Sequence, residues 1–568
     1  MDPLHFRFQS GGPCSREARI PNQHRVMALD FKSVKEYIAM NQDMRNYEIP
    51  LCFSNTEIIT TYYALQDIYF HFSVMSENCS RQFSDLIEKI RRTTVGINVE
   101  HPLADGRKTR RIYLDSTAST LQLGVVQDVI RQYAPYYANT HTTVHFNAKL
   151  STREYTWAHQ ECLRFVNADA DTYGCFFVGS GTTGGINRIA RTMCRKRPER
   201  DVVITSIMEH HSNDLPHRKH FNKVVHIPVV ATAQGLGAVD LNALKKALGK
   251  YGDRVNYVAV TGVSNVTGII NPIHDIAELA HACGALILVD AAQMAAHLPI
   301  RMSGHENPMR NIDLLALSGH KIYAPSSPGA VVTRKDLFSE IEPDEVGGGM
   351  VDDVYTEDYL CTSNFPDREE AGTPNILGAI ALATSLYTLR SIGMDRISEH
   401  ETEIIDHAID RLSRIDDVVI YGHHGTDEYR RAGAVSINIR DMHHSLTAAI
   451  LNDYFNIAVR NACFCAHPYV REMISEDLGE QMEDLSNEEL EALADLHRGM
   501  VRCSFGIYNT AEDVDALADA LQKIVANKDD YKARYRQNQC NDYVHQTFAF
   551  DSKEVFSASD AVKRWLHG

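Results

Sequence analysis

The chain has 568 residues, 44% of them hydrophobic, so its length allows roughly two to four domains with sizeable buried cores. The formal net charge is −17 and the basic residues form no long run, which argues against a nucleic-acid partner. The sequence also lacks an uninterrupted apolar stretch of about 18 residues, so we expect no membrane span and no membrane partner.

Twelve cysteines are scattered along the chain rather than spaced as a disulfide framework. In a chain of this length, the pattern predicts reduced thiols and an intracellular location, most simply the cytoplasm. The first residues do not have the charged and then apolar layout of a signal peptide, and Asp2 disfavours an organellar transit peptide without excluding an organelle. Cys463 and Cys465 lie close together, but one Cys-x-Cys pair is a weak indication of zinc.

Residues 1–108 contain no recognisable motif. The stretch 83–90 spaces its apolar residues as a helix does. We therefore interpret residues 1–108 as an N-terminal extension that is largely helical and whose role the sequence does not indicate.

The character of the sequence changes at Arg111, and from about residue 160 strand and helix patterns alternate. Apolar runs predict strands at 202–207, 224–230, 257–262, 286–289, 312–317 and 330–333. Helical periodicity predicts helices at 241–248, 276–282 and 376–390. This alternation predicts a mainly parallel sheet covered on both faces, and in such sheets ligands bind at the loops beyond the strand ends. We expect this large domain to span residues 109–395.

A smaller domain is predicted at 396–527, with helices at 402–412 and 512–524 and strands at 418–421 and 434–439. It contains an acidic, helix-prone insertion at about 471–498, most simply a solvated surface. The tail, 528–568, is charged and then aromatic, and it predicts no function.

Lys321 follows the predicted strand 312–317 directly, beside Ser318 and His320. A lysine at such a position is unusual, because lysine is rarely buried without a partner or a chemical role. One suitable role is a Schiff base with an aldehyde cofactor, which needs a positioned amine in apolar surroundings. A surface lysine at a strand end is the simpler interpretation, and this stretch alone does not separate the two.

A glycine-rich turn, 179–185, follows the apolar run 176–178 and precedes a helical stretch. Such a turn at a helix N-terminus aims backbone N–H groups at one point, which suits a phosphate, and Thr182 and Thr183 add hydroxyl groups. The turn is not a Walker loop, because no Gly-Lys-Ser/Thr follows. A plain strand-to-helix connection is the alternative.

Two further strand ends carry polar residues. Asp290 follows the strongest apolar strand, where it could pair with the ring nitrogen of pyridoxal phosphate, and Gln293 could bond a ring oxygen. The alternative role for Asp290 is to cap the next helix. The turn 209–213 contains His210 and His211 but no third ligand at metal spacing, which leaves a histidine stacked on a cofactor ring or a solvated loop pair.

The loop 459–468 contains Arg460 and Cys465 and is predicted to follow a strand. A cysteine in a loop near an arginine is a candidate thiolate nucleophile, although a bystander cysteine is the simpler interpretation. Arg502 lies in a predicted strand of the same domain, and two arginines near a cleft could bind a substrate carboxylate. Surface arginines without a ligand are the alternative.

Together, the order and spacing of these motifs resemble the class V aminotransferase-like pyridoxal phosphate enzymes, and most closely the cysteine desulfurases of the selenocysteine-lyase-like branch. The resemblance covers about residues 111–527 and rests on segments 113–115, 181–183, 209–213, 264–268, 290–293, 318–321, 371–375, 460–465 and 502–510. It implies an α/β fold of the aspartate aminotransferase type (fold type I), with a large mainly parallel-sheet domain and a smaller C-terminal α/β domain.

The resemblance also implies residue roles. Lys321 would hold pyridoxal 5'-phosphate covalently, His210 would stack on its ring, and Asp290 and Gln293 would bond the pyridine nitrogen and the phenolic oxygen. Cys465 would accept the sulfur. The phosphate would be held by Thr182, Thr183, Ser318 and His320, together with Thr373 from a second subunit. The substrate carboxylate would be held by Asn265 and Arg502, with Arg460 assisting.

The implied activity converts L-cysteine to L-alanine and places the sulfur on Cys465 as a persulfide, in a homodimer that passes sulfur to an acceptor protein. Alternatives are another lyase or transaminase of the family, selenocysteine lyase-like or molybdenum cofactor sulfurase-like, and a catalytically idle scaffold.

The sequence departs from the family pattern in two places. Gly184 and Gly185 stand where an acidic residue and an alanine are common in the family, and the insertion after Cys465 predicts a different sulfur delivery. Cys463 could resolve a persulfide on Cys465 by forming a disulfide.

Overall fold

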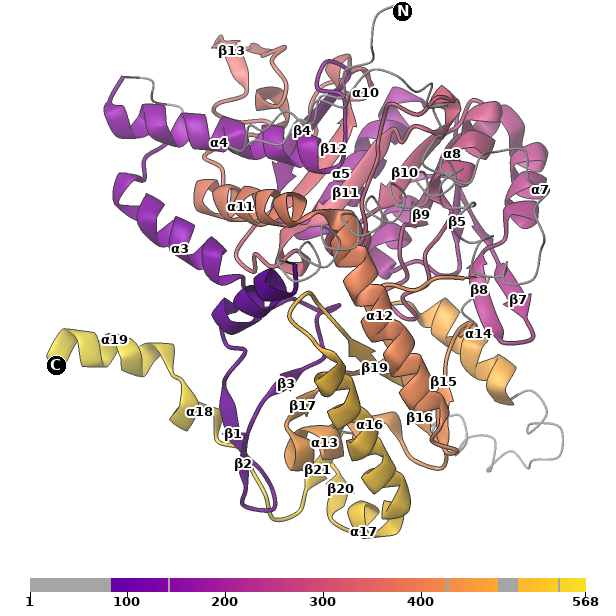
Figure 1. Ribbon diagram of the computed structural model, residues 1–568. Helices are drawn as coiled ribbons and strands as arrows, with labels where there is room; N and C mark the ends of the chain where they lie inside the picture. Colours follow the sequence, from indigo (N-terminus) through magenta and orange to yellow (C-terminus); the bar gives the residue numbers. More distant parts are fainter. Residues whose placement is uncertain (1–82, 141, 143, 425–428, 479–498, 540–541) are drawn as a thin grey trace, which may run out of the picture. The chain divides into compact units, whose positions relative to one another are not determined.

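The central element is a seven-stranded sheet built from the middle of the chain (Figure 1). The computed structural model describes residues 83–140, 142, 144–424, 429–478, 499–539 and 542–568. In sheet order the strands are β4 (Tyr173–Val178), β12 (Gly329–Arg334), β11 (Leu314–Ser318), β10 (Leu286–Asp290), β9 (Val255–Thr261), β5 (Val202–Ser206) and β6 (Lys223–Ile227). Strand β12 runs antiparallel to both its neighbours and the other pairs are parallel, so the predicted mainly parallel sheet is confirmed.

Helices cover both faces of this sheet because alternate strand residues point to opposite sides. On one face, Val203, Tyr257 and Leu314 pack with α5 (Gly181–Lys196). On the other face, their neighbours in the strands pack with α7 (Leu241–Tyr251) and α8 (Ile273–Ala282). All seven residues of β9 are buried, as expected for a parallel strand covered twice.

The predicted elements of the large domain are present with small shifts of their ends. Predicted helix 376–390 lies within α11 (Ile376–Ile392), which packs against α3 (Gly124–Tyr133) and α4 (Phe146–Phe165). Predicted strand 224–230 is wrong in one respect, because β6 ends before Pro228 and Val229 begins a separate strand. Proline cannot donate to a ladder, which explains the break.

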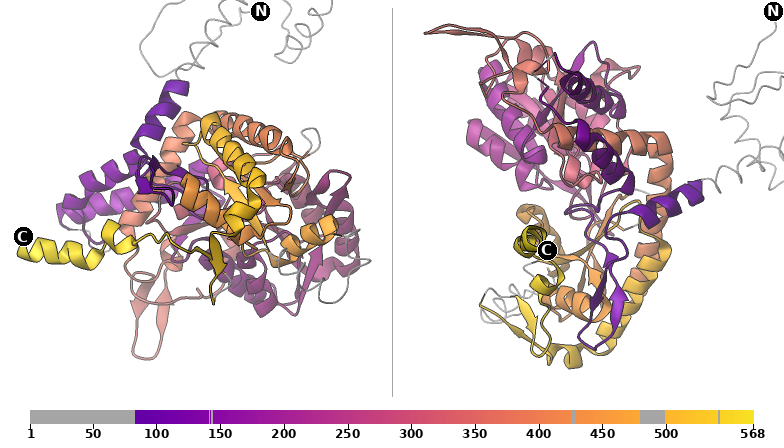
Figure 2. Two further views of the ribbon diagram at one scale, coloured as in Figure 1. Left: turned by 90° about the horizontal axis from the view of Figure 1, so that it is seen from below. Right: turned by 90° about the vertical axis from the view of Figure 1, so that its left-hand side faces the viewer.

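Smaller elements complete this domain. They are the helices α6 (Leu215–His220), α9 (Met294–His297) and α10 (Asp336–Ser339), and the hairpins β7 (Val229–Thr232) with β8 (Gly235–Val239) and β13 (Val351–Val354) with β14 (Tyr359–Cys361). Hairpin β13–β14 projects from the body of the domain (Figure 2).

The small domain is built on a four-stranded antiparallel sheet. Its strands, in order, are β15 (Val418–Ile420), β16 (Ala434–Ile439), β19 (Met500–Ser504) and β18 (Arg460–Ala462). Its helices are α12 (Met394–Ser413), α13 (His444–Phe455), α14 (His467–Leu478) and α16 (Ala511–Ala526). Helix α12 runs from the large domain into this one (Figure 1). Most of the predicted acidic insertion, 479–498, lies outside the described residues.

Segments near both ends of the described chain pack on the two domains, with Ile87 and Ile90 in the core of the large one. Near the N-terminus, residues 83–93 are helical, β1 (Glu100–Pro102) pairs with β2 (Lys108–Arg110), and β3 (Ile112–Tyr113) pairs with β17 (Ile457–Ala458). Near the C-terminus, β20 (Tyr535–Gln537) pairs with β21 (Tyr543–His545), and Tyr535 is buried in the core of the domain. The remaining helices are α17 (Lys528–Lys532), α18 (Ser552–Val555) and α19 (Ala558–His567).

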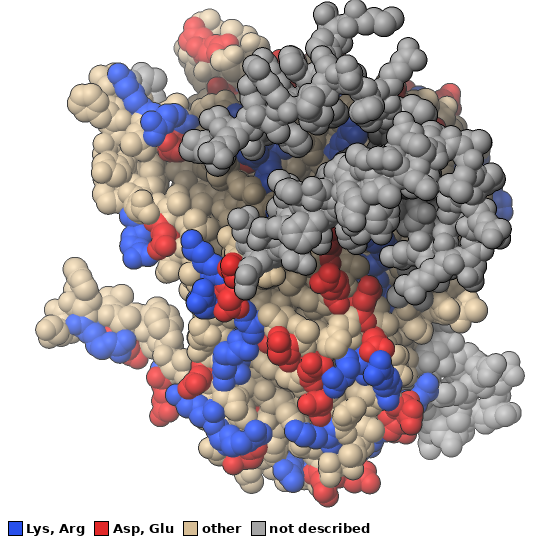
Figure 3. Space-filling view, in the orientation of Figure 1, with Lys and Arg blue, Asp and Glu red and all other residues tan. Residues whose placement is uncertain are grey.

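The distribution of surface charge and the length of the apolar helices bear on the expected absence of nucleic-acid and membrane partners. On the face shown in Figure 3, acidic and basic side chains are interspersed over the small domain, without a uniform patch of either sign. Within the described ranges, no single helix is long and apolar enough to cross a bilayer; α11 and α12 satisfy such a test only as a pair bent by 81°.

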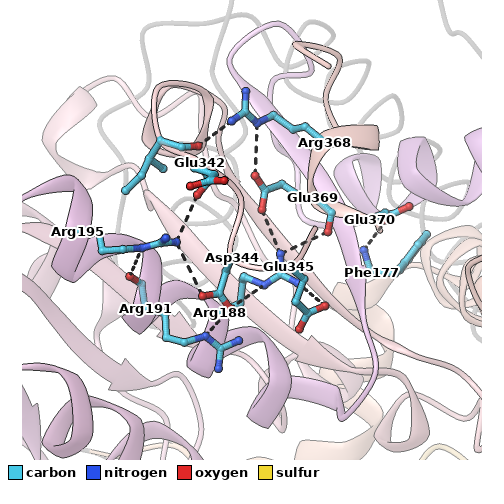
Figure 4. A network of polar contacts seen from close by, with 11 residues as sticks. Phe177, Arg188, Arg191, Arg195, Glu342, Asp344, Glu345, Arg368, Glu369 and Glu370 are labelled. Carbon is cyan, nitrogen blue, oxygen red and sulfur yellow. Dashed lines mark hydrogen bonds and ion pairs between the residues drawn. The ribbon is translucent and has the colours of Figure 1, made fainter. Parts of the chain in front are cut away.

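Helix α5 is tied to the segment before α11 by a network of ion pairs around the buried side chains of Arg188 and Glu369 (Figure 4). The Arg188 side chain, 4% exposed, lies 3.2 Å from a carboxylate oxygen of Glu369 and 2.8 Å from one of Glu345. Arg368 lies 3.4 Å from Glu369 and donates to two backbone carbonyls. Glu370 then accepts the Phe177 N–H at 2.6 Å. These contacts fix three consecutive charged residues, 368–370, just before the segment that contains Thr373.

We expect Arg188→Met to lower the free energy of unfolding by about 3 kcal/mol, because it leaves the Glu369 carboxylate buried with a weaker partner. Urea denaturation measures the loss. The double variant Arg188→Met/Glu369→Leu is the control and should recover much of it, since an apolar pair removes both buried charges. A double variant as unstable as the single one would contradict this account.

Candidate active site

A cavity of about 260 Å³ opens beyond the carboxyl ends of β9, β10 and β11, where these strands meet the small domain. It is lined by every predicted site residue except Thr373, namely Thr182, Thr183, His210, Asn265, Asp290, Gln293, Ser318, His320, Lys321, Arg460, Cys465 and Arg502. It is also lined by residues to which no motif assigned a role, namely Thr117, Ala118, Ser180, Ser212, Thr261, Ala292 and Phe464.

One end of the cavity is formed by the N-terminus of α5. Gly181 has a φ of +59°, and a Cβ there would lie 2.6 Å from Ser318 Oγ, so glycine is required by both conformation and space. Ser318 Oγ accepts the N–H of Thr182 at 2.8 Å, and the hydroxyls of Thr183 and Ser212 are 2.7 Å apart. Hydroxyl groups gathered at a helix N-terminus make this end suitable for a phosphate.

Lys321 ends a short 3-10 turn, Gly319–Lys321, directly after β11. Burial lowers the pKa of the Lys321 amine to about 8, although the nearby carboxylate of Asp290 opposes the shift. A substantial fraction of the amine is therefore neutral and nucleophilic near pH 8. Burial, reinforced by the positive charge of Lys321, lowers the pKa of His320.

Asp290 is buried at the end of β10 and accepts the N–H of Ala292 at 2.9 Å. Burial raises the pKa of its carboxyl group. The alternative of a helix cap is wrong, because the N-cap of α9 is Gln293. The Gln293 side chain donates to the carbonyl of Thr117 at 3.0 Å, which holds it in the cavity wall.

The imidazole of His210 is held by Ser212. Its Nδ1 accepts the Ser212 N–H at 3.1 Å, which places the proton of the neutral ring on Nε2. Burial, reinforced by the charge of Lys321, lowers the pKa of His210 to about 3. His210 is thus a neutral aromatic ring at neutral pH, the form suited to stacking on a flat cofactor.

The guanidinium of Arg502 forms the opposite wall. Its Nη1 donates to the carbonyl of Asn265 at 2.8 Å and its Nη2 to Asp115 at 3.3 Å. Burial lowers the pKa of Arg502 to about 10, so it is still a cation at neutral pH. Its buried Nε has no hydrogen-bond partner within the part of the chain that the structure describes. An anionic ligand such as a carboxylate would satisfy this donor.

Cys465 lies at the cavity mouth in the turn between β18 and α14. Its side chain is exposed, and its carbonyl accepts the N–H of His211 at 2.8 Å. Cys463 is half-buried, and burial raises the pKa of its thiol. Arg460, exposed on β18, opposes the rise that burial causes in the pKa of Asp115.

Thr373 lies outside this cavity. It is exposed, and its hydroxyl accepts a hydrogen bond from the side chain of Asn139 at 3.2 Å.

Comparison with known proteins decides the family. A family model described as aminotransferase class-V matches residues 112–517. The chain belongs to the class-V aminotransferase family. A probable cysteine desulfurase from Halalkalibacterium halodurans is 34% identical over 414 residues, which cover 72% of this chain and 92% of the relative. A probable cysteine desulfurase from Pyrococcus abyssi is 30% identical over 417 residues, or 73% and 94% of the two chains.

Solved structures agree with this class-V assignment. The apo cysteine desulfurase of Thermococcus onnurineus has a TM-score of 0.63 and 29% identity, covering 73% of this chain and 95% of its own. The cysteine desulfurase CsdA of Escherichia coli has a TM-score of 0.62 and 27% identity, covering 78% and 98%. The resemblance drawn from the motifs and the fold type that it implied are confirmed.

Class-V aminotransferases and cysteine desulfurases depend on pyridoxal 5'-phosphate, and the residues of the cavity fit this cofactor. The start of α5 offers donors for the phosphate, Asp290 a buried acid for the ring nitrogen, and Lys321 an amine for the aldehyde. Arg502 in the cavity lining supplies a cation for the carboxylate of an amino acid.

Cofactor-free protein should capture pyridoxal phosphate faster as the pH rises, levelling off above about 8. The neutral amine of Lys321 is the nucleophile, and its population grows as the pH passes the pKa. Stopped-flow absorbance measures the rate.

Borohydride reduction followed by mass spectrometry should find the cofactor on Lys321, and Lys321→Ala should lose it. Lys245→Ala, which removes an exposed lysine of α7, is the matched control. A capture rate that does not change with pH would contradict the lowered pKa.

Proposed function

We propose that the chain is a pyridoxal phosphate-dependent cysteine desulfurase, which converts L-cysteine to L-alanine and takes the sulfur as a persulfide on Cys465. The observation that carries the proposal is the exposed Cys465 thiol at the mouth of a cavity that contains Lys321 and Arg502. The curated relatives, named probable cysteine desulfurases, support the same activity.

The first step is the orientation of the substrate. Arg502 and Asn265 both line the cavity, and the buried Nε of Arg502 has no hydrogen-bond partner among the described residues. A carboxylate bound there neutralises the buried cation and directs the rest of the amino acid toward Lys321. We propose this pair as the carboxylate site.

The second step is proton transfer. When bound, pyridoxal phosphate supplies an electron sink for the negative charge that develops at Cα. The amine of Lys321, partly neutral because of its burial, removes the Cα proton and can return it. His210 lines the cavity with its proton on Nε2 and can serve as a donor.

The third step is sulfur transfer. The Cys465 thiolate attacks the sulfur of the substrate, and a new S–S bond forms as the C–S bond breaks. The electron pair of that bond stays with the substrate carbon, which takes up a proton and leaves as alanine. Arg460, also in the cavity wall, lies in the strand that leads to Cys465.

Cys465→Ala should lower persulfide formation and alanine production from L-cysteine by roughly a hundredfold or more, because the nucleophile is lost. Product analysis with labelled cysteine and mass spectrometry of the protein measures both. Cys463→Ser is the matched control and should retain alanine production, since burial raises the pKa of that thiol. Unchanged alanine production in Cys465→Ala would exclude this mechanism.

We also propose a homodimer in which Thr373 completes the phosphate site of the partner. Thr373 is hydrogen-bonded to Asn139. Large apolar side chains are exposed near Asn139 in the sequence, including Tyr136, Val144 and Phe146, and Phe146 is 89% exposed. Apolar side chains exposed together are typical of protein interfaces.

Phe146→Glu should weaken the dimer by at least about tenfold, because it would bury a charge in the interface. Sedimentation velocity measures the oligomeric state, and retention of the cofactor should fall with it. Val562→Glu, at an exposed apolar position of α19, is the matched control. A Phe146→Glu protein that behaves as the wild type would count against this surface.

The sulfur acceptor is proposed to be a protein that approaches the exposed Cys465. The resolving role of Cys463 stays a prediction, and sulfide release from Cys463→Ser tests it. The cytoplasmic location also stays a prediction, which cell fractionation tests.

A further inference from the structure

The turn that carries Cys465 is anchored to the proposed carboxylate site through its neighbour Phe464. The Asn265 side-chain amide donates to the carbonyl of Phe464 at 2.8 Å. The Arg502 guanidinium carbon lies over the Phe464 ring, 4.7 Å from its centroid. Because Arg502 also donates to the carbonyl of Asn265, these three residues form one closed unit.

This turn needs anchors because its backbone is unfavourable. Ala462, Phe464 and Cys465 have φ values of +95°, +50° and +56°, in the left-handed region that residues other than glycine rarely adopt. Such conformations persist only where the surroundings impose them. Among these three, Phe464 is buried in an apolar cluster that includes Met208, whereas Cys465 is exposed.

We propose that Phe464 is a positioning residue that ties the Cys465 thiol to Asn265 and Arg502, the same two residues that hold the substrate. The inference rests on the proposed function. Asn265 and Arg502 fix the carboxylate, and thereby the place of the substrate sulfur. The same two side chains fix Phe464, and thereby the place of the next residue, Cys465. The distance between thiol and sulfur then depends on a single rigid unit.

The aromatic ring matters beyond its bulk. A cation over an aromatic face is attracted by the ring quadrupole, and the attraction is larger where both groups are desolvated. Arg502 and Phe464 are both buried, at 3% and 6% exposure. An aliphatic residue at position 464 would keep the apolar packing and the backbone contact with Asn265 but lose this attraction.

The test compares Phe464→Leu with Phe464→Tyr, which keeps a ring over Arg502. In Phe464→Leu, the single-turnover rate of persulfide formation on Cys465 should fall by about tenfold, the order of effect expected for a lost buried cation–π contact. The Kd for L-alanine, read from the absorbance of bound cofactor, should change by less than about twofold, since Arg502 and Asn265 are intact. Phe464→Tyr should restore the rate.

A third measurement separates placement from reactivity. Alkylation of Cys465 by iodoacetamide in the absence of substrate should be as fast in Phe464→Leu as in the wild type, or faster. Three results would overturn the inference. They are a wild-type rate of persulfide formation in Phe464→Leu, a rate in Phe464→Tyr as low as in Phe464→Leu, and a loss of L-alanine affinity in Phe464→Leu as large as its loss of rate. If the wild type forms the persulfide and Phe464→Leu forms it equally fast, only the positioning role of Phe464 is refuted. If the wild type forms no persulfide, the proposed function is refuted as well.

Discussion

The burial of Lys321 beside the carboxylate of Asp290 is the interaction on which the rest of the site depends. Strands β10 and β11 are neighbours, with Asp290 opposite Ala316, so residues that follow both strands emerge at the same edge. Burial favours the neutral amine and the carboxylate favours the cation, and the balance places the pKa of Lys321 at about 8. A fully exposed lysine would be almost wholly charged, and one buried without Asp290 would have a still lower pKa.

Helix α5 links this chemistry to the rest of the domain. Its first turn presents hydroxyl groups to the cavity, and Arg188, two turns on, is held by the carboxylates of the network in Figure 4. That network also fixes Glu369 and Glu370, which precede Thr373. One helix thus sets the phosphate end of its own cavity and the segment proposed to reach a partner's cavity, so the two sites share a rigid support.

The sequence was sufficient for what depends on local pattern. Apolar runs marked the strands, and polar residues such as Asp290 and Lys321 were found at their ends, where ligands bind in parallel sheets. The family resemblance then implied that Arg502 and Cys465 share a site, and in the structure both side chains line the same cavity. The split of predicted strand 224–230 was foreseeable from Pro228.

Other features depend on contacts that no local pattern records. Phe464 meets Asn265 across 199 positions of sequence, and Thr117 meets Gln293 across 176. No motif marks Phe464 or Thr117 in its own segment, and the place of each in the site follows from the tertiary fold, which brings distant segments together. The burial of Arg188 was equally hidden, because its acidic partners lie in a distant segment.

The small domain is assembled from segments that lie far apart in the sequence, and this affects when the site can form during synthesis. Its core joins β3, near residue 112, with strands around residues 434 and 500 and with Tyr535. Contacts of such sequence separation form late in folding, because a long loop must close before they are gained. The wall of the cavity that carries Cys465 and Arg502 can therefore assemble only after nearly the whole chain has left the ribosome. During synthesis the part of the site that contains Lys321 is made before the wall that carries Cys465 and Arg502. A chain that is still growing therefore has no complete active site.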